Sequence, residues 1–292
     1  MNKKRIFTLS SIVFSDTCGA AVIILVIPLY VIKQFNATAF QAALVIAAYY
    51  AAQFIAAPWL GRLSDRYGRR PVLLISQAGT ITSYILFIFA FPLGNLLDSA
   101  GLRAGMPDGL LIIYIARILD GITGGNISVA QAYASDISTN AERTRALGMV
   151  GGASGIGHIA GPALAGLLVG ITLSAPFIGA ALLSVITLTL TMLWLKETST
   201  AQLKSGESTM QTGDTSMIKS LSNKSVVLIL ATALLIGLYL AMLSSTFSLY
   251  ADKVLFHGQQ PAAIVRISSV ILTALGLLMA LSQMTILNPM AR

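Results

Sequence analysis

Charge and cysteine are both scarce in this chain. Asp, Glu, Lys and Arg make up 10% of its 292 residues, against about 25% in a typical soluble domain. Apolar residues make up 55%, and the mean hydropathy is +0.80. The single cysteine, Cys18, excludes a disulfide framework and a paired-cysteine metal site. Because lipid offers no partner to an unpaired backbone group, the apolar segments should be helical. We therefore expect an all-α membrane protein.

Sequence motifs of catalysis are also missing. The chain has no phosphate-binding glycine loop with its lysine, no metal-ligand cluster and no nucleophile–base spacing. We therefore expect neither an enzyme nor a bound cofactor or metal. The net charge of +8 does not indicate nucleic-acid binding, because the basic residues are spread over short loops between apolar runs.

Uncharged runs divide the chain into candidate membrane spans. About 20 apolar residues cross a bilayer as a helix. The stretch from Ala146 to Leu195 is too long for one span, and Gly170 and Pro176 divide it into a helical hairpin. The sequence thus predicts eight helices, at residues 6–32, 38–60, 71–93, 109–135, 146–169, 175–195, 225–250 and 262–287.

Basic residues set the orientation of these spans. With the N-terminus in the cytoplasm, Lys33, Arg103 and Lys253 lie outside, while Arg117 and Arg266 lie within spans. The other basic residues are cytoplasmic, namely Lys3, Lys4, Arg5, Arg62, Arg66, Arg69, Arg70, Arg143, Arg145, Lys196, Lys204, Lys219, Lys224 and Arg292. This asymmetry follows the positive-inside rule and predicts a multi-pass protein of the plasma or inner membrane with both termini in the cytoplasm.

A polar segment, residues 196–224, interrupts the hydrophobic pattern. It is rich in Ser, Thr, Lys, Gln and Gly, and we interpret it as a flexible cytoplasmic linker. Six predicted helices precede it in residues 1–195, and two follow it in residues 225–292. The domain prediction is therefore an N-terminal six-helix bundle, the linker and an incomplete C-terminal bundle.

Ionisable residues inside the predicted spans are candidates for function, since each is costly in lipid. Asp16 lies roughly 15 Å into the first helix, where it is either a proton- or cation-binding group or a structural hydrogen-bonding one. Arg117 and Asp120 share one helix face, either as a mutually neutralising pair or as charges that act on a polar cavity. His158 is a candidate proton relay or substrate contact, or a side chain that only bonds a neighbour.

Two further segments contain conspicuous glycines. The basic turn at residues 61–71 carries four arginines and one aspartate, and we predict that it gates the cytoplasmic face as well as orienting the chain. Its candidate gate residues are Gly61, Asp65, Arg66, Gly68, Arg69 and Arg70. The predicted helix 146–169 has glycines that recur at spacings of three, four and five residues around Pro162, which indicates either tight helix packing or a bent seam that moves.

These segments resemble signatures of the major facilitator superfamily. The basic turn resembles the signature between its second and third helices, and residues 117–121 look like its helix 4 arginine motif. Residues 157–166 are similar to the helix 5 motif of drug/proton antiporters, with Ala165 in place of the usual second glycine. Residues 134–143 are similar to the loop between helices 4 and 5 of tetracycline-type exporters, a subgroup that Asp16 also fits.

The resemblance implies a transporter of twelve helices, in two six-helix bundles that rock around a central cavity. The proton and substrate cavity would contain Asp16, Arg117, Asp120 and His158. The cytoplasmic gate would comprise the basic-turn residues together with Asp136 and Arg143. The hinge between the bundles would be formed by Gly157, Gly161, Pro162 and Gly166.

Proton-driven export of drug-like or amphipathic molecules by a monomer would follow from this resemblance. The alternatives are an uptake permease for a sugar or organic acid, and a truncated remnant that does not transport. Because the predicted spans stop after the eighth helix, we expect a fragment or a truncated product. The helices that carry Asp16 and Arg117 would then face lipid or an incomplete cavity.

Overall fold

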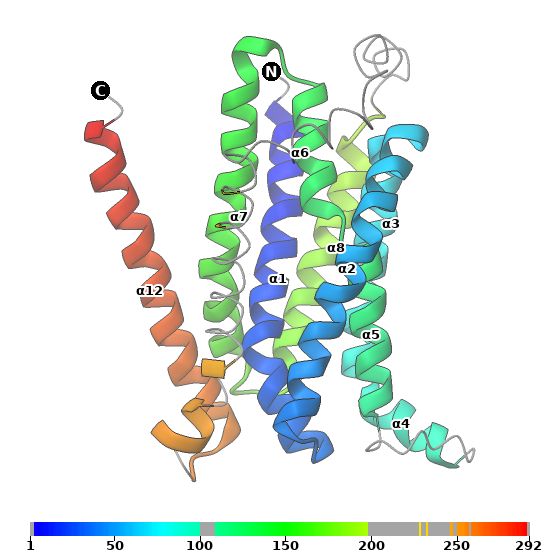
Figure 1. Ribbon diagram of the computed structural model, residues 1–292, viewed down its shortest axis with the longest axis vertical. Helices are drawn as coiled ribbons and strands as arrows, with labels where there is room; N and C mark the ends of the chain where they lie inside the picture. Colours follow the sequence, from blue (N-terminus) through cyan, green and yellow to red (C-terminus); the bar gives the residue numbers. More distant parts are fainter. Residues whose placement is uncertain are drawn as a thin grey trace.

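A computed structural model shows an upright bundle of helices (Figure 1). The structure describes residues 3–99, 109–197, 250–256 and 258–290, and the single positions 228, 232, 246 and 247. The first helices are α1 (Lys3–Phe35), α2 (Ala39–Tyr67), α3 (Arg69–Ile88) and α4 (Ala90–Ser99). They are followed by α5 (Leu110–Thr123), α6 (Asn126–Asp136), α7 (Asn140–Leu168) and α8 (Ala175–Trp194), and later by a short π-helix, η1 (Ala251–Leu255), and α12 (Pro261–Met290).

The predicted all-α membrane fold is confirmed. Six segments are long and apolar enough to cross a bilayer, namely α1, α2, α3, α5 together with α6, α8, and α12 as far as Leu278. Helix α7 is less apolar because of its glycines, His158 and Pro162, but it lies alongside α1 through the bundle (Figure 1). Seven of the eight predicted spans thus correspond to described helices. The predicted span 225–250 and the predicted linker 196–224 lie almost wholly outside the described residues.

Helix α1 lies at the centre of the bundle, packed against α6, α7 and α8. In the most apolar 18-residue stretch of α1, 72% of the residues are buried, compared with 17% in the corresponding stretch of α2. The expectation that the helices carrying Asp16 and Arg117 face lipid is therefore wrong for α1, and Arg117 on α5 is itself only 2% exposed. Neighbouring helices of the N-terminal half bury Arg117 and leave Asp16 half-buried, without help from a second bundle.

Two apolar clusters fill the core at different heights. One contains Val22, Leu29, Phe87 and Phe177, and the other contains Ile6, Leu9, Leu73 and Tyr133. Along α1 the clusters are separated by residues 14–21, and along α3 and α8 by buried serine, threonine and glutamine side chains. Burial of apolar surface stabilises the two ends of the core, and a polar layer lies between them.

The basic turn is much shorter than the sequence suggested. Helix α2 continues to Tyr67 and α3 begins at Arg69, so residues 61–67 form the last two turns of α2. Gly68 alone joins the two helices, with φ at +99°, a value that favours glycine because it has no Cβ. Asp65 in the last turn of α2 and Arg69 at the start of α3 lie on either side of Gly68, and their side chains form an ion pair with 2.5 Å between Oδ1 and Nη1.

Helices α7 and α12 meet at one end and diverge at the other (Figure 1). A methyl group added at Gly166 would lie 2.6 Å from the Ser269 Cβ, and one added at Gly276 would lie 2.8 Å from Ile159 Cγ1. Beyond this contact the same face of α7 is open, because a methyl at Gly148, Gly151, Gly152 or Gly155 would meet no described atom within 4 Å.

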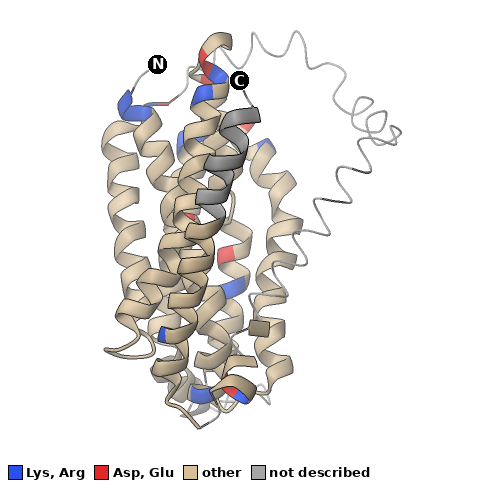
Figure 2. Ribbon diagram, turned by 90° about the vertical axis from the view of Figure 1, so that its left-hand side faces the viewer, with Lys and Arg blue, Asp and Glu red and all other residues tan. Residues whose placement is uncertain are grey.

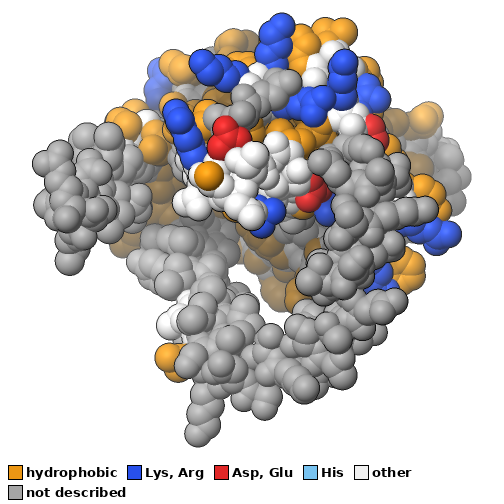
Figure 3. Space-filling model, turned by 90° about the horizontal axis from the view of Figure 1, so that it is seen from above, with side chains coloured by type: hydrophobic (Ala, Val, Ile, Leu, Met, Phe, Trp, Pro, Cys, Tyr) orange, Lys and Arg blue, Asp and Glu red, His pale blue; other side chains and the backbone are white. Residues whose placement is uncertain are grey.

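Charged residues lie mainly at the two ends of the bundle, with few along its length (Figure 2). Viewed onto the end that carries the N-terminus, most of the visible Lys and Arg side chains lie over the upper half of the face (Figure 3). This distribution agrees with a bundle that crosses a membrane along its long axis.

Candidate functional site

The Asp16 carboxylate lies in the polar layer at the middle of α1 and is half-buried. Its Oδ1 accepts a hydrogen bond of 2.9 Å from Asn126 Nδ2. Asn126 is the first residue of α6, directly after Gly124 and Gly125 interrupt the helix that begins with α5. Gln53 Nε2 donates to the Gly124 carbonyl that the interruption frees, at 2.9 Å. The glycine break thus places the Asn126 amide beside Asp16.

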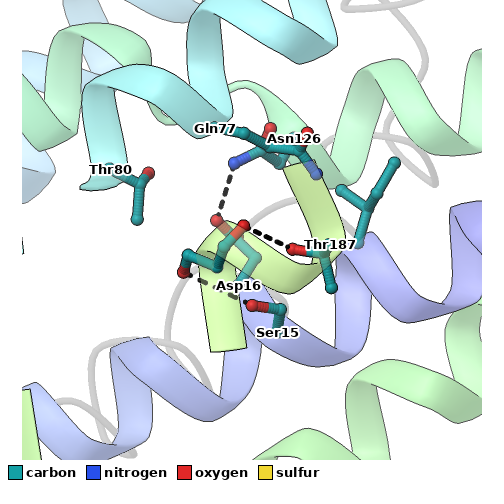
Figure 4. Close-up of a pocket in the computed structure, with 8 residues that line it drawn as sticks. Ser15, Asp16, Gln77, Thr80, Asn126 and Thr187 are labelled. Carbon is teal, nitrogen blue, oxygen red and sulfur yellow. Dashed lines mark hydrogen bonds between the residues drawn. The ribbon is translucent and has the colours of Figure 1, made fainter. Parts of the chain in front are cut away.

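A small pocket opens next to Asp16, between α1, α3, α6 and α8 (Figure 4). The space open to the centre of a water molecule is about 10 Å³, which is enough for one water. Its lining is polar apart from one isoleucine and consists of Ile12, Ser15, Asp16, Gln77, Thr80, Asn126, Ser184 and Thr187.

Several polar atoms at this pocket lack a hydrogen-bond partner among the described residues. They are Gln77 Nε2 and Oε1, Thr80 Oγ1 and Asn126 Oδ1. Gln77 and Thr80 are 3% and 5% exposed, so bulk solvent does not reach them freely. Buried polar groups are almost always paired with protein or with ordered water. The pocket is therefore chemically suited to a small polar guest.

Arg117 and Asp120 form the ion pair that their spacing on α5 predicts. Arg117 Nη1 lies 3.1 Å from Asp120 Oδ2, and the two residues are 2% and 7% exposed. The Arg117 guanidinium also lies 4.5 Å from the centre of the Tyr49 ring, which adds a cation–π attraction. A paired and stacked arginine can remain charged inside the bundle at a tolerable cost.

His158 does not join this group. It is exposed on α7, where its Nδ1 lies 2.9 Å from the Ser154 carbonyl oxygen of the same helix. The neighbouring Gly157 faces α1, with Thr17 and Phe14 against it. The structure therefore brings Asp16, Arg117 and Asp120 into one layer and places His158 on another face of α7.

Asn126, Gln77 and Thr80 are site residues that the sequence prediction missed. Each is an uncharged side chain within an apolar run, so none is conspicuous by charge. A signal was present in α3, where Ser76, Gln77, Thr80 and Ser83 recur at helical spacing on one face. All of them are buried.

Arg69 contacts two of the other predicted gate residues, Asp65 and Asp136, at the N-terminal end of the bundle. Its Nε donates to Asp136 Oδ2 at 3.0 Å, and its Nη1 contacts Asp65 and donates to Ser64 Oγ at 2.6 Å. Its backbone N–H donates to Glu197 Oε1 at 3.1 Å. These contacts tie the ends of α2, α3 and α6 to the residues that follow α8.

The remaining gate candidates lie at the edge of that network. Arg70 Nη2 donates to the Met192 carbonyl of α8 at 3.0 Å. The Arg66 guanidinium lies 5.5 Å from the centre of the Tyr67 ring. Arg143 is exposed on the first turn of α7, and Gly61 has open space around its Cα.

The predicted hinge residues are packing positions on an unbroken α7. Gly157 and Gly161 face α1, and a methyl at Gly161 would lie 2.6 Å from both the Ala21 Cβ and the Cys18 carbonyl oxygen. Gly166 faces α12, and Pro162 lies within the helix between the two contacts. One helix thus packs closely on both sides.

Several characterised proteins are similar to this chain. Tetracycline resistance protein class B of Escherichia coli is 35% identical over 186 residues, which cover 63% of this chain and 42% of that protein. Tetracycline resistance protein class H of Pasteurella multocida is 38% identical over 201 residues, covering 68% and 46%. Multidrug resistance protein 2 of Bacillus subtilis is 29% identical over 285 residues, covering 95% and 66%. The chain spans about half the length of the tetracycline resistance proteins it matches.

Two solved structures share the fold. A D-xylose-proton symporter superimposes with a TM-score of 0.62 at 16% identity, over 96% of this chain and 68% of the symporter. The human organic anion transporter MFSD10 (TETRAN) gives 0.53 at 20% identity, over 68% of this chain and 49% of that one. At these identities the likeness concerns the fold alone. Residues 9–290 match the Major Facilitator Superfamily, and the chain therefore belongs to that superfamily.

Proposed function

We propose that this chain functions in proton-driven export of drug-like or amphipathic small molecules across the plasma or inner membrane. The observation that carries the proposal is the half-buried Asp16 carboxylate, held in the polar layer beside the Arg117–Asp120 pair. A carboxylate at that depth can gain and lose a proton, whereas Arg117 stays charged. Its relatives include tetracycline and multidrug resistance proteins, which favours export.

We further infer that the end with the N-terminus lies in the cytoplasm, as the positive-inside rule requires for its Lys and Arg side chains (Figure 3). The diverging ends of α7 and α12 would then face the cytoplasm, and their contact at Gly166 would lie on the outer side. This is the arrangement expected when a rocking transporter is open inward. In this scheme the Arg69 network belongs to the cytoplasmic gate, and the glycines of α7 allow the bundles to rock.

The test is transport by the purified full chain in proteoliposomes with an imposed pH gradient. A tetracycline and an amphipathic fluorescent dye are the probes. Gradient-dependent movement of either probe is expected, and Asp16→Asn should abolish it because the amide cannot carry the proton. Ser11→Ala on an exposed face of α1 is the matched control. Transport that persists in Asp16→Asn would remove Asp16 from the coupling role.

The same assay separates the alternatives. Uptake of a sugar or organic acid with the proton gradient would indicate a permease, for which the symporter's fold likeness at 16% identity supplies no argument. A chain that inserts and folds but moves no solute would indicate a non-transporting product.

A further inference from the structure

The pocket beside Asp16 combines features that the transport proposal does not use. It has room for one water molecule, and it is lined by a carboxylate and by four polar atoms that lack partners among the described residues. Water molecules buried in proteins typically make about three hydrogen bonds to such groups. Gln77 Nε2 can donate to a water, Gln77 Oε1 and Asn126 Oδ1 can accept from it, and the Thr80 hydroxyl can do either.

Thr80 has a second neighbour of importance. It lines the pocket together with Asp16 and also lies close to the Asp120 carboxylate. Its Oγ1 has no well-aligned hydrogen bond in this arrangement. The hydroxyl can therefore rotate to bond either a guest in the pocket or the Asp120 carboxylate. Asp120 in turn is bound to Arg117. The pocket and Thr80 therefore connect the half-buried Asp16 to the buried Arg117–Asp120 ion pair.

We propose that the pocket is a binding site for a single water molecule, which with the Thr80 hydroxyl relays a proton between Asp16 and Asp120. The inference deepens the proposed function and rests on it only for the direction and purpose of the proton movement. Gln77 and Asn126 act as positioning residues, because they hold the water and the Asp16 carboxylate in place.

The transfer step is a plain exchange of protons. Protonated Asp16 gives its proton to the water, the water passes one to the Thr80 oxygen, and the Thr80 hydroxyl gives its own to the Asp120 carboxylate. Asp16 becomes an anion, Asp120 becomes neutral, and water and Thr80 end unchanged. The neutral Asp120 no longer balances Arg117, so the charge of the arginine becomes available to the new Asp16 anion or to an anionic group of the substrate.

The groups that act on this relay come from all surrounding helices. Arg117 and Asp120 face it from α5, Tyr49 from α2 and Tyr84 from α3, and the charges of Asp16 and Asp120 act on both tyrosines. From α6 and α8 the pocket receives Asn126, Ser184 and Thr187, which do not titrate. His158 on α7 lies on an exposed face. The two carboxyls are therefore the proton-carrying pair of the layer.

The first test is direct observation of the water. A high-resolution map of the full chain in lipid should show one ordered water within hydrogen-bonding distance of Gln77 and Thr80. An empty or apolar-filled pocket in a map that resolves other waters would overturn the proposal. Thr80→Val should remove that density, since a methyl replaces one of its partners.

The second test is infrared spectroscopy of the two carboxyl groups in lipid films. Asp16→Asn and Asp120→Asn assign the two bands. In the unchanged chain the two carboxyls should titrate as a coupled pair, and the Asp120 band should follow a pH jump as fast as the Asp16 band. In Thr80→Val the response of Asp120 should slow by at least about tenfold, as expected for loss of a positioned proton-transfer group.

Matched variants separate the relay from a folding defect. Thr80→Ser keeps the hydroxyl and should retain the fast response. Thr82→Val makes the same change two residues away on the exposed face of α3, where the hydroxyl donates to the Ala78 carbonyl at 2.8 Å, and should have no effect. Equal response rates in Thr80→Val and Thr82→Val would refute the relay.

These experiments distinguish failure of the relay from failure of the proposed export function. A chain that exports nothing but shows coupled carboxyl bands sensitive to Thr80→Val retains the relay and loses the export proposal. If the chain exports with the proton gradient but Thr80→Val leaves the carboxyl bands unchanged, the export proposal stands and the relay is refuted.

Discussion

Arg117 is among the largest fully buried side chains in the described bundle. Its charge is balanced by Asp120 and stacked on Tyr49, and these contacts replace the water that the guanidinium loses. Removing one partner of a buried ion pair costs more than removing both, because the remaining charge is left without compensation. The pair is therefore better tested by comparing single and double variants than by one substitution.

We expect Arg117→Ala to destabilise the chain by about 3–5 kcal/mol, because Asp120 keeps its buried charge without a partner. Arg117→Lys should lose less stability, because lysine keeps the positive charge although it lacks the planar guanidinium group. The double variant Arg117→Ala/Asp120→Ala should be more stable than Arg117→Ala alone. Thermal unfolding in detergent measures these three variants and Asp120→Ala alone. A double variant whose loss equals the sum of the single losses would show that the pair is not coupled.

At the scale of helices, the hydrophobic pattern was sufficient to predict most of the fold. Long uncharged runs specified seven described spans because a bilayer demands about 20 apolar residues from each. The exact ends were harder to predict. Residues 61–67 look like a loop by their charge, yet they extend α2, since Arg, Leu and Asp are compatible with a helix once they leave the lipid. The proposed domain division and linker stay predictions.

The site was predictable only where it was charged. Asp16, Arg117 and Asp120 stand out in an apolar run, and the spacing of the latter two predicted their contact. Gln77, Thr80 and Asn126 are uncharged, and their convergence depends on how four helices pack. The glycine break at 124–125, which aims Asn126 at Asp16, also leaves the hydrophobic pattern unchanged. Packing geometry of this kind is not encoded in any one segment.

At the scale of single helices, the glycines of α7 allow a prediction. Some of them pack against a neighbouring helix, whereas others face open space. Gly157 faces Thr17 and Phe14 of α1 without room for a methyl, while Gly152 faces open space. Gly157→Ala should therefore push α1 and α7 apart and destabilise the chain by about 1–3 kcal/mol.

Gly152→Ala is the matched control for that change. It should be neutral or stabilise α7 by up to about 1 kcal/mol, because alanine has the higher helix propensity. Fluorescence-detected melting in detergent compares the two. Similar melting temperatures for both variants would mean that the close packing of α1 on α7 contributes nothing measurable. Normal stability of Gly152→Ala with reduced transport would indicate that the open face is covered in another stage of the cycle.

For the molecule as a whole, contacts between α1, η1 and α12 join the N-terminal helices to the last described helix. Lys33 Nζ at the end of α1 lies 3.1 Å from Asp252 Oδ1 in η1, and Ala251 beside it is buried in the core formed with α1. This ion pair and the Gly166–Ser269 contact lie at the end of the bundle where α7 and α12 meet, and we infer that both favour its closed state. Opening of that end requires the ion pair to break.

We expect Lys33→Met to weaken this closure. The ion pair is partly exposed, with 40% of the Lys33 side chain accessible, so its contribution is about 0.2–1 kcal/mol and its loss should raise the open population up to about fivefold. The measurement is the alkylation rate of a Ser269→Cys variant in a Cys18→Ser background, since Ser269 is buried at the closed end. Lys33→Arg keeps the charge and should keep the rate low. A rate unaffected by Lys33→Met would exclude the ion pair as a determinant of closure.

The single-residue joint at Gly68 has a mechanical consequence. Consecutive Cα atoms are 3.8 Å apart along the chain, so the last turn of α2 and the first turn of α3 have almost no slack between them. When helix α2, with Phe54 and Trp59 largely exposed on its surface, moves at this joint, the first turn of α3 must move with it. Gln77 and Thr80 lie on α3 about two and three turns beyond the joint, so we expect a displacement of the start of α3 to change the spacing of the pocket beside Asp16.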